Sequence, residues 1–392
     1  MDCGSPTYWR WIGEMLKPRA LRTVARYVEW FERMDESQGK ERREVWIVFI
    51  DEGESLHHLL YSNDDSATED GPTTEGDDDG EDFTVSSTVN FGAREGEGAG
   101  AEETADAPPL SVVMPSRFWH KIKADSVDGA SEAIREILRQ ALSSLAELHS
   151  IGITHRDVKP ENLIVSLRGV GSEGRVGTPL IRLADFGSAD TTPIGLPPEL
   201  WPSPLRRPSR AELTTDYESP EVIFAAQPDA ETDRSAAYDI WSVGVMLVEL
   251  VIGTSKVWGV SDRARSIIEA LLPQEDAAVK EMAFTLRSMA DLCVFVPELG
   301  DELPTPDGAA RSAEQRKARR AARRAGAAKG QDAACGDAEM ASSLQQRDPH
   351  GVGLPSASGR DLLRRLLAWE PTERIMASEA LEHPFLQPSE EH

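Results

Sequence analysis

The longest regular stripe of apolar residues lies between residues 134 and 148. Its members recur at intervals of three and four, the spacing that puts side chains on one face of a helix: Ile134, Ile137, Leu138, Ala141, Leu142, Leu145 and Leu148. This stripe predicts a long helix with one buried face. A second apolar run, residues 241–253, carries one charged residue, Glu249. It is too short to cross a bilayer and predicts a buried helix.

Shorter apolar runs predict strands. Residues 45–50 form a continuous β-favouring run, and residues 24–31 read as its antiparallel neighbour. Residues 163–165 and 181–184 flank a glycine-rich stretch, as two strands around a turn would. The last third of the chain is helical in pattern.

Composition shifts mark two interruptions in this chain of 392 residues. Residues 62–107 hold 15 acidic residues and one base, Arg94, a mixture that cannot bury enough apolar area to offset its ordering entropy. Residues 301–351 are rich in Ala, Gly and charge. Both stretches are expected to be disordered inserts, which leaves 295 residues of globular character.

Charge and cysteine usage narrow the class of protein. The net charge of −26 argues against nucleic-acid binding over the whole surface. Residues 311–329 carry eight Arg or Lys and are either an import or nucleic-acid tract or a solvated helical linker that attracts the acidic insert. Cys3, Cys293 and Cys335 show no pairing framework, so the cytoplasm or nucleus is expected. The first 20 residues lack a signal-peptide core, and no membrane partner is expected.

The residues that carry chemistry follow the long helix. The segment His-Arg-Asp-Val-Lys-Pro-Glu-Asn, residues 155–162, places Asp157 and Asn162 five apart on a predicted loop. A proton acceptor and a metal-binding amide in one small volume suit phosphoryl transfer. Asp185-Phe186-Gly187 then stands at the end of a predicted strand, where the carboxylate suits magnesium.

In this order the motifs resemble those of eukaryotic protein kinases of the serine/threonine type. Further segments carry the resemblance: Tyr217-Glu218-Ser219-Pro220-Glu221, Asp239-Ile240-Trp241-Ser242-Val243-Gly244, Trp369-Glu370-Pro371-Thr372-Glu373-Arg374-Ile375 and His383-Pro384-Phe385-Leu386. The resemblance implies an α+β, bilobed fold with a mainly helical large lobe. It also implies transfer of the ATP γ-phosphate to a Ser or Thr hydroxyl of a protein substrate, with ATP and Mg²⁺ as cofactors.

The family's roles fall on individual residues of this chain. The resemblance implies that Asp157 orients the substrate hydroxyl, Lys159 neutralises the transferred phosphoryl group, and Asn162 and Asp185 hold magnesium. Lys159, with Thr214 ahead of Glu221, is typical of serine/threonine kinases. The remaining implied roles belong to the scaffold: Glu221 pairs with Arg374, Asp239 holds the catalytic loop, Arg156 senses a phosphate on the activation segment, and His155 packs.

The family's glycine loop and lysine strand are absent ahead of the predicted helices, so the small lobe is expected to be truncated. Residues 169–174 match the glycine string but favour a hairpin connection, and Glu14 would lack its lysine partner. Two strands alone would leave the side chains of Trp30, Phe31, Trp46 and Phe49 without a covering sheet. That face would be covered by an upstream segment or by an activating or covering partner protein, or it would stay uncovered. His57 and His58 are expected to lie at the exposed start of a helix.

The expected organisation is a remnant small lobe and hinge over 1–61, an acidic insert over 62–107, the large lobe over 108–300, an insert over 301–351 and C-terminal helices over 352–388. The chain resembles plant-type kinase-like proteins, some of them described as inactive and some joined to a type 2C phosphatase domain. Three interpretations stay open: an active kinase, a catalytically impaired pseudokinase or scaffold, and a fragment of a longer kinase or kinase-phosphatase polypeptide.

Overall fold

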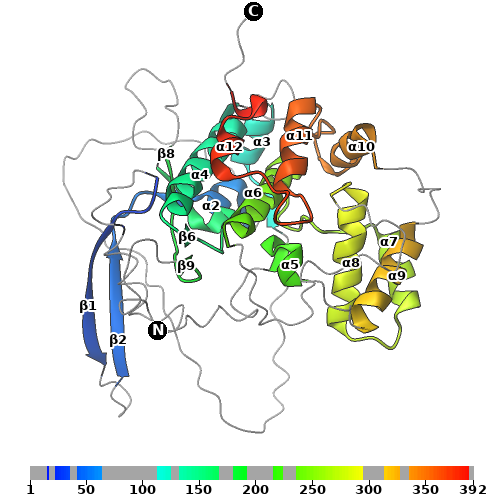
Figure 1. Cartoon of the computed structure of the whole chain (residues 1–392), viewed down its shortest axis with the longest axis horizontal. Coiled ribbons are helices and arrows are strands. Elements are labelled where there is room, and N and C mark those ends of the chain that lie inside the picture. The colour runs from blue at the N-terminus through cyan, green and yellow to red at the C-terminus, as the bar shows by residue number, and fades with distance from the viewer. Residues whose placement is uncertain are drawn as a thin grey trace, which may run out of the picture.

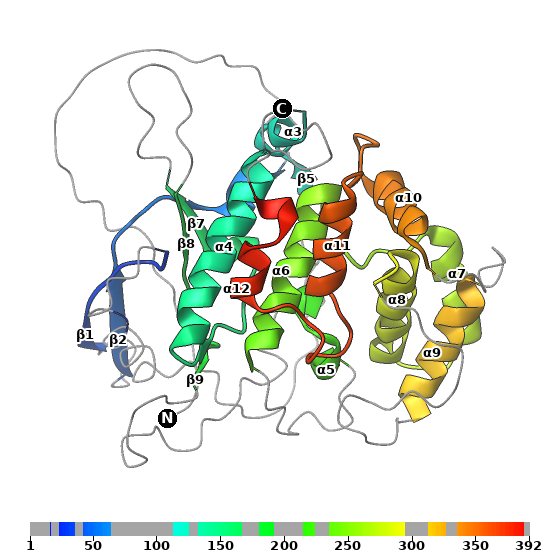
Figure 2. The ribbon, with the colours of Figure 1, turned by 45° about the horizontal axis from the view of Figure 1, so that its top comes forward.

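The computed structural model describes residues 16, 23–35, 42–63, 113–124, 132–166, 180–191, 215–223, 235–294, 313–326 and 335–387. A two-stranded arm stands at one side of a larger, mainly helical body (Figure 1). The three-stranded sheet lies where the arm meets the body (Figure 2). This arrangement agrees with the predicted α+β fold with a small strand-built part and a helical large part.

The arm is the predicted antiparallel hairpin. Strands β1 (Tyr27–Asp35) and β2 (Arg42–Phe49) pair from Tyr27↔Phe49 to Asp35↔Arg42, with an irregularity between Tyr27 and Glu29. At the base of the arm, the rings of Tyr27 and Phe49 meet edge to face at 6.0 Å. The side chains of Trp30, Phe31 and Trp46 lie outside the described residues, so the uncovered face stays a prediction.

Two short elements connect the arm to the body. Strand β3 (Glu54–Ser55) joins a three-stranded antiparallel sheet with β7 (Leu163–Ser166) and β8 (Leu180–Leu183), in the order β3-β7-β8. The pairing of β7 with β8 confirms the predicted strands. Helix α2 (Leu56–Leu60) follows, capped by the Ser55 side chain, so His57 and His58 lie in the first turn of a helix as expected, with His58 exposed and His57 half-buried.

The predicted acidic insert begins and ends at neighbouring strands. Strand β4 (Tyr61–Asn63) pairs with β5 (Val113–Pro115), with Asn63 opposite Val113. The chain that leaves the body at β4 therefore returns beside it. Residues 64–112 lie outside the described part, so their predicted disorder stays a prediction.

The core of the body forms around two long helices. Helix α4 (Glu132–Ser150) buries the stripe predicted from the sequence, and α6 (Ser235–Ile252) contains the predicted buried run. Figure 2 shows α4, α6, α11 (Ala357–Leu366) and α12 (Ala377–Leu381) side by side. Helix α3 (Arg117–Ala124) is anchored by Trp119, whose indole N–H donates to the carbonyl of Leu250 at 3.0 Å.

Short elements complete the body. Strands β6 (Ile153–Thr154) and β9 (Asp190–Thr191) pair with each other, and helix α5 spans Pro220–Ile223. Three 3₁₀ turns are formed at Pro160–Asn162, Thr215–Tyr217 and Pro384–Leu386.

A second group of helices differs from the prediction. Helices α7 (Asp262–Leu271), α8 (Ala277–Asp291) and α9 (Ala313–Gly326) cluster at the far end from the hairpin, and α10 (Asp337–Arg347) lies between them and α11 (Figure 2). Residues 301–351 were expected to be disordered, yet α9 and α10 form within them. The reason is that Ala318 and Ala321 pack against buried apolar side chains of α7 and α8, and Met340 and Leu344 of α10 are buried.

Two cysteines also differ from the expectation. Cys293 and Cys335, for which the sequence shows no pairing framework, are joined by a disulfide. Their Cα atoms lie 5.4 Å apart, within the usual range for such a bond. Among the residues that the structure describes, none of the helices combines the length and the apolar character needed to span a bilayer.

Candidate active site

The buried carboxylate of Asp239 holds the backbone of the loop that carries the predicted catalytic residues. Asp239, near the start of α6, accepts backbone N–H bonds from His155 at 2.9 Å and Arg156 at 2.7 Å, and its Oδ2 also lies 2.8 Å from His149 Nε2. Its side chain is fully buried. Arg156 has a φ of 66°, in the left-handed region that L-residues seldom adopt. Asp239 therefore fixes a loop conformation that would otherwise be unfavourable.

Three predicted site residues meet on this loop. Asn162 donates from Nδ2 to the Asp157 carbonyl oxygen at 2.7 Å and to its Oδ2 at 2.9 Å. The Lys159 ammonium lies 2.8 Å from the same Oδ2. Both charged side chains are mostly buried, with 16% of Lys159 and 11% of Asp157 exposed. Because two positively polarised groups share one oxygen, the Asp157 carboxylate is fixed in orientation.

Asp185 follows strand β8 and lies beside the catalytic loop. The Ala184 N–H donates to the Asn162 carbonyl at 2.8 Å, and Leu163 pairs with Leu183, so the segment leading to Asp185 runs beside Asn162. Asp185 has a φ of 61° and accepts the Gly187 N–H at 3.2 Å through Oδ1. Its side chain is exposed. The structure thus brings the four predicted catalytic residues to one edge of the β7–β8 pair.

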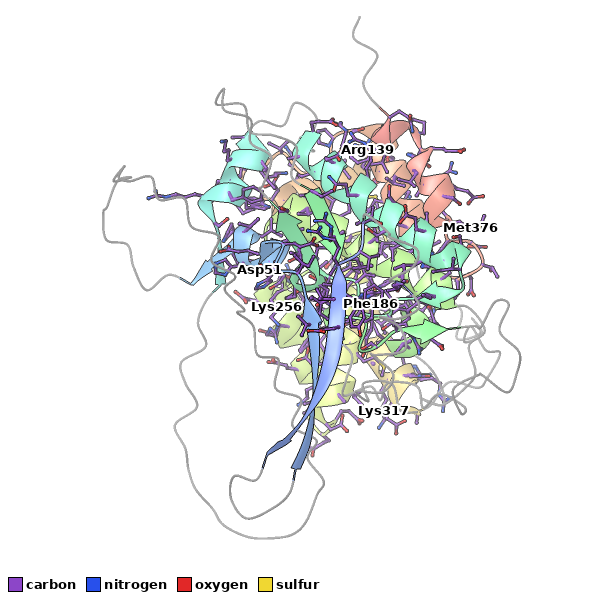
Figure 3. The ribbon with its side chains drawn as sticks, turned by 90° about the vertical axis from the view of Figure 1, so that its left-hand side faces the viewer. Asp51, Arg139, Phe186, Lys256, Lys317 and Met376 are labelled. Atoms are coloured by element: carbon purple, nitrogen blue, oxygen red, sulfur yellow. A yellow bond between two sulfur atoms is a disulfide. The ribbon has the colours of Figure 1, made fainter. Side chains whose placement is uncertain are left out.

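Phe186 and His155 lie beneath this edge. The phenyl ring is buried and meets the imidazole of His155 edge-on, with 4.8 Å between ring centroids. His155 Nε2 lies 2.8 Å from the Ala184 carbonyl oxygen. Figure 3 shows Phe186 inside the body, behind the β1–β2 hairpin. These contacts confirm that His155 is a packing residue and explain why Asp185 faces outward while Phe186 faces in.

The donor set fits a magnesium ion that is shared with phosphate. Asn162 uses its amide nitrogen toward Asp157, which leaves its amide oxygen for a cation, and Asp185 adds an exposed carboxylate. Oxygen ligands of this kind suit Mg²⁺, which usually takes one or two protein carboxylates together with phosphates and water. In the described part of the chain, no cluster of three or more His, Cys, Asp or Glu residues is arranged to hold a metal alone.

Arg156 carries unused hydrogen-bonding capacity. Its Nε and Nη1 atoms are buried without a hydrogen-bond partner, although Nη1 lies 3.6 Å from Asp190 Oδ2. The guanidinium carbon lies 5.8 Å from the centroid of the Tyr238 ring. Such donors match the phosphate-sensing role that the resemblance implies. Of the residues on the activation segment that could accept this phosphate, Thr191, Thr192, Ser203, Ser209 and Thr215, the middle three lie outside the described residues.

The junction between the arm and the body contains a residue that sequence reasoning missed. Glu52 is buried and pairs with Arg26 of the arm and with Arg182 of β8, the latter at 3.1 Å. The next residue, Gly53, has a φ of 134°, and a Cβ there would lie 2.2 Å from the Val165 carbonyl oxygen. An acidic residue directly before glycine at the end of a strand was the available signal.

A second missed feature ties three parts of the body together. The fully buried carboxylate of Glu249 in α6 accepts the Tyr61 hydroxyl at 2.6 Å and also the Tyr217 hydroxyl. Burial raises the pKa of Glu249 to about 7, against the opposing effect of the two tyrosine hydrogen bonds. The pKa values of Tyr61 and Tyr217 are also raised, first by burial and then by the Glu249 charge. The sequence signal was a lone glutamate in an apolar run.

Two predictions about the small lobe and the glycine string, those for Glu14 and for residues 169–174, fall on residues outside the described part of the chain. The expected ion pair of Glu221 with Arg374 is present.

Comparison with known proteins shows which sequences and structures this chain is similar to. A sequence model of the protein kinase domain matches residues 111–386. A protein of Arabidopsis thaliana named "probable inactive protein kinase" is 30% identical over 380 residues, covering 94% of this chain and 85% of that protein. A serine/threonine-protein kinase of Aspergillus oryzae is 28% identical over 271 residues, covering 65% of this chain and 54% of its own length. A cell division control protein 2 homologue of Trypanosoma brucei brucei is 28% identical over 264 residues, 67% of this chain and 68% of that protein.

The fold has solved counterparts. The crystal structure of the yeast RNA polymerase II CTD kinase complex aligns with a TM-score of 0.51 and 15% sequence identity, covering 98% of this chain and 83% of the matched chain. At this identity the likeness shows the fold alone. The family match covers well over half of the chain and contains the loop, the Asp185 segment and the Glu221–Arg374 pair. The chain belongs to the protein kinase domain family, with serine/threonine kinases among its relatives.

Proposed function

We propose that the chain is a protein serine/threonine kinase that binds ATP with Mg²⁺ and transfers the γ-phosphate to a Ser or Thr hydroxyl of a protein substrate. One observation carries the proposal. Asp157 is held by Lys159 at 2.8 Å and Asn162 at 2.9 Å, in a loop fixed by Asp239. Positioning of this kind supplies much of the rate in phosphoryl transfer, which needs little covalent help from the protein.

Each of the four residues would have its own role in the reaction. Asp157 orients the attacking hydroxyl and takes up its proton as the bond from the hydroxyl oxygen to the γ-phosphorus forms. Lys159, within reach of Asp157, offsets negative charge on the transferred group while the bond to the ADP oxygen breaks. The Asn162 amide oxygen and the Asp185 carboxylate would hold magnesium, which supplies charge neutralisation on the phosphates when bound.

The choice of a hydroxyl from Ser or Thr rests on Lys159 and on relatives named as serine/threonine kinases. A protein substrate and a location in the cytoplasm or nucleus are part of the same proposal.

A phosphotransfer assay tests the proposal. The purified chain is incubated with γ-labelled ATP, Mg²⁺ and casein, alone and as the Asp157→Ala and Asp185→Ala variants. We expect each variant to lose about 100-fold or more of the signal, the size typical of removing a group that acts in proton transfer or charge stabilisation. Asp262→Ala, at the exposed start of α7, is the matched control and should keep full activity. Equal signals from all four proteins would defeat the proposal.

A catalytically impaired pseudokinase or scaffold is the second candidate. Two observations favour it: Lys17 and Lys40 are the only lysines ahead of Leu56, and the Arabidopsis relative is named as inactive. In this interpretation the domain binds a protein partner at the small lobe and does not transfer phosphate. The assay above separates the two, because a scaffold gives the signal of the Asp157→Ala variant.

A further inference from the structure

The disulfide joins the two ends of an inserted segment. Cys293 stands two residues after the end of α8, with a φ of 58°, and Cys335 stands two residues ahead of α10. The bond therefore closes residues 294–334 into a loop at its base. Cys293 is 7% exposed, whereas Cys335 is half-buried and is therefore the more exposed of the two residues.

The closed loop contains the basic helix α9. Its inner side meets α7 and α8 through alanines, with Ala318 and Ala321 packed against Ile268 and Phe284. Its outer side carries exposed basic residues, of which Lys317 pairs with Glu275 at 2.6 Å: Arg316, Lys317, Arg320, Arg323 and Arg324. Alanine side chains bury little apolar area. Docking of α9 therefore depends on how tightly the ends of the loop are held.

Other contacts hold α8 to α10 without the bond. Arg347 of α10 donates to Ser288 Oγ at 3.0 Å and to the Val257 carbonyl at 3.1 Å. Ser343 of α10 donates to the Asp291 carbonyl at the end of α8. Opening the disulfide thus leaves the two helices packed. What is lost is the covalent link between Cys293 and Cys335 at the base of the loop that carries α9.

We infer that Cys293 and Cys335 form a redox-responsive disulfide that controls how firmly the basic helix α9 is held on α7 and α8. In the cytoplasm or nucleus, the location proposed for this chain, a disulfide is more often transient and redox-sensing than structural. The inference rests on the geometry of α8, α9 and α10 and not on phosphotransfer.

The chemistry is thiol–disulfide exchange with a dithiol reductant. A thiolate of the reductant attacks the sulfur of Cys335, forms a mixed disulfide and releases Cys293, which takes up a proton. The second thiol of the reductant then closes the reductant's own disulfide and releases Cys335 as a thiol. Two electrons and two protons pass to the chain, and the oxidised reductant runs the same steps in reverse.

Limited proteolysis tests the inference, because trypsin cleaves after Arg and Lys and α9 carries six of them. The full chain is digested after air oxidation or after dithiothreitol treatment, and cuts within residues 313–326 are timed by mass spectrometry. We expect cleavage there to be about 10-fold faster in the reduced chain, because proteolysis follows the population of the opened segment. The Cys335→Ser and Cys293→Ser variants should be cut at the reduced rate under both conditions.

Cys3→Ser is the matched control and should behave as the parent chain, since Cys3 lies outside the pair. Thiol counting by alkylation accompanies each digest. One free thiol in the oxidised chain and three in the reduced chain are expected, with return to one on reoxidation by oxidised glutathione. Three free thiols after oxidation, equal cleavage rates in both states, or equally faster cleavage throughout the body would each overturn the inference.

Discussion

Arg374 binds both carboxylate oxygens of Glu221, with Nη1–Oε1 and Nη2–Oε2 distances of 2.7 and 2.6 Å. The two residues lie 153 positions apart, and the guanidinium is fully buried. Arg374 also donates to the carbonyls of Ala368, Ala237 and Trp369. This pair fixes the start of α5, where the activation segment ends, to the loop ahead of α12.

Replacing the forked side chain tests this brace. We expect Arg374→Lys to lower the free energy of unfolding by about 3–5 kcal/mol, because a lysine cannot bind both oxygens and leaves buried acceptors unmet. Urea unfolding measures the change. Arg365→Lys is the matched control, since Arg365 pairs with Asp361 at the surface, and should cost less than about 1 kcal/mol. Equal losses in both variants would contradict the role of the buried pair.

Asp239 should control the order of the catalytic loop. In Asp239→Asn one oxygen becomes an N–H₂ group, which must face a backbone N–H of His155 or Arg156. We expect a loss of about 1–3 kcal/mol in unfolding free energy and faster hydrogen exchange at these two amides. Asp262→Asn, a change of the same kind at an exposed site, should alter neither. Unchanged exchange in Asp239→Asn would show that the loop is held by other means.

Glu249 should make stability depend on pH. Its pKa is raised from 4.5 to about 7 in the folded chain, so between these values the folded state binds more protons than the unfolded state. Stability is therefore highest below the unfolded pKa and falls as pH rises toward the folded pKa. From pH 5 to pH 8 we expect Glu249 to cost about 2 kcal/mol.

Glu249→Gln isolates this contribution, because the amide keeps a hydrogen-bonding partner for Tyr61 and Tyr217 but does not titrate. The fall in urea-derived stability between pH 5 and pH 8 should be smaller in the variant than in the parent chain. A fall of equal size in both would assign the pH dependence to other groups.

Gly53 should be irreplaceable at the junction of arm and body. In Gly53→Ala the new Cβ would lie 2.2 Å from the Val165 carbonyl oxygen, at a φ of 134°, so strand β3 must shift from β7. We expect a loss of about 2–3 kcal/mol in unfolding free energy. Gly351→Ala separates the clash from the backbone strain. That glycine has a φ of 66° with nothing within 4 Å of a new Cβ, so about 1 kcal/mol is expected.

Local pattern was enough to predict several parts of this fold. The apolar stripe of α4 and the run inside α6 gave those helices, because each buried face repeats over several turns. The β7–β8 pair and the loop bearing Asp157 and Asn162 were predicted because their residues lie close together in sequence. The gathering of Asp185 with that loop was implied by the resemblance to protein kinases, and the hydrogen bond from the Ala184 N–H to the Asn162 carbonyl agrees with it.

Contacts between distant residues were predicted only where the kinase resemblance implied them, as for Glu221 and Arg374. Tyr61 lies 188 positions from Glu249, and Cys293 lies 42 positions from Cys335, so no local spacing indicates either contact. The segment of helix α9 was expected to be an import or nucleic-acid tract or a solvated helical linker inside a disordered insert. Its docking on α7 and α8 was missed because alanine contributes a weak apolar signal among many arginines. The pairing of Glu52 with Arg26 and Arg182 depends on the packing of the arm against the body.

The central claim is that Asn162 and Asp185 form a working magnesium–ATP site, and magnesium-dependent ATP binding tests it most directly. Melting temperatures are measured for the parent chain, Asp185→Asn and the control Asp262→Asn, with ATP alone and with ATP and Mg²⁺. A ligand that binds only the folded state raises the melting temperature, and at 100 times its dissociation constant it adds about 2.7 kcal/mol. The account predicts a magnesium-dependent rise in the parent chain and in Asp262→Asn but not in Asp185→Asn; no rise in any of them, or an equal rise in all three, would contradict it.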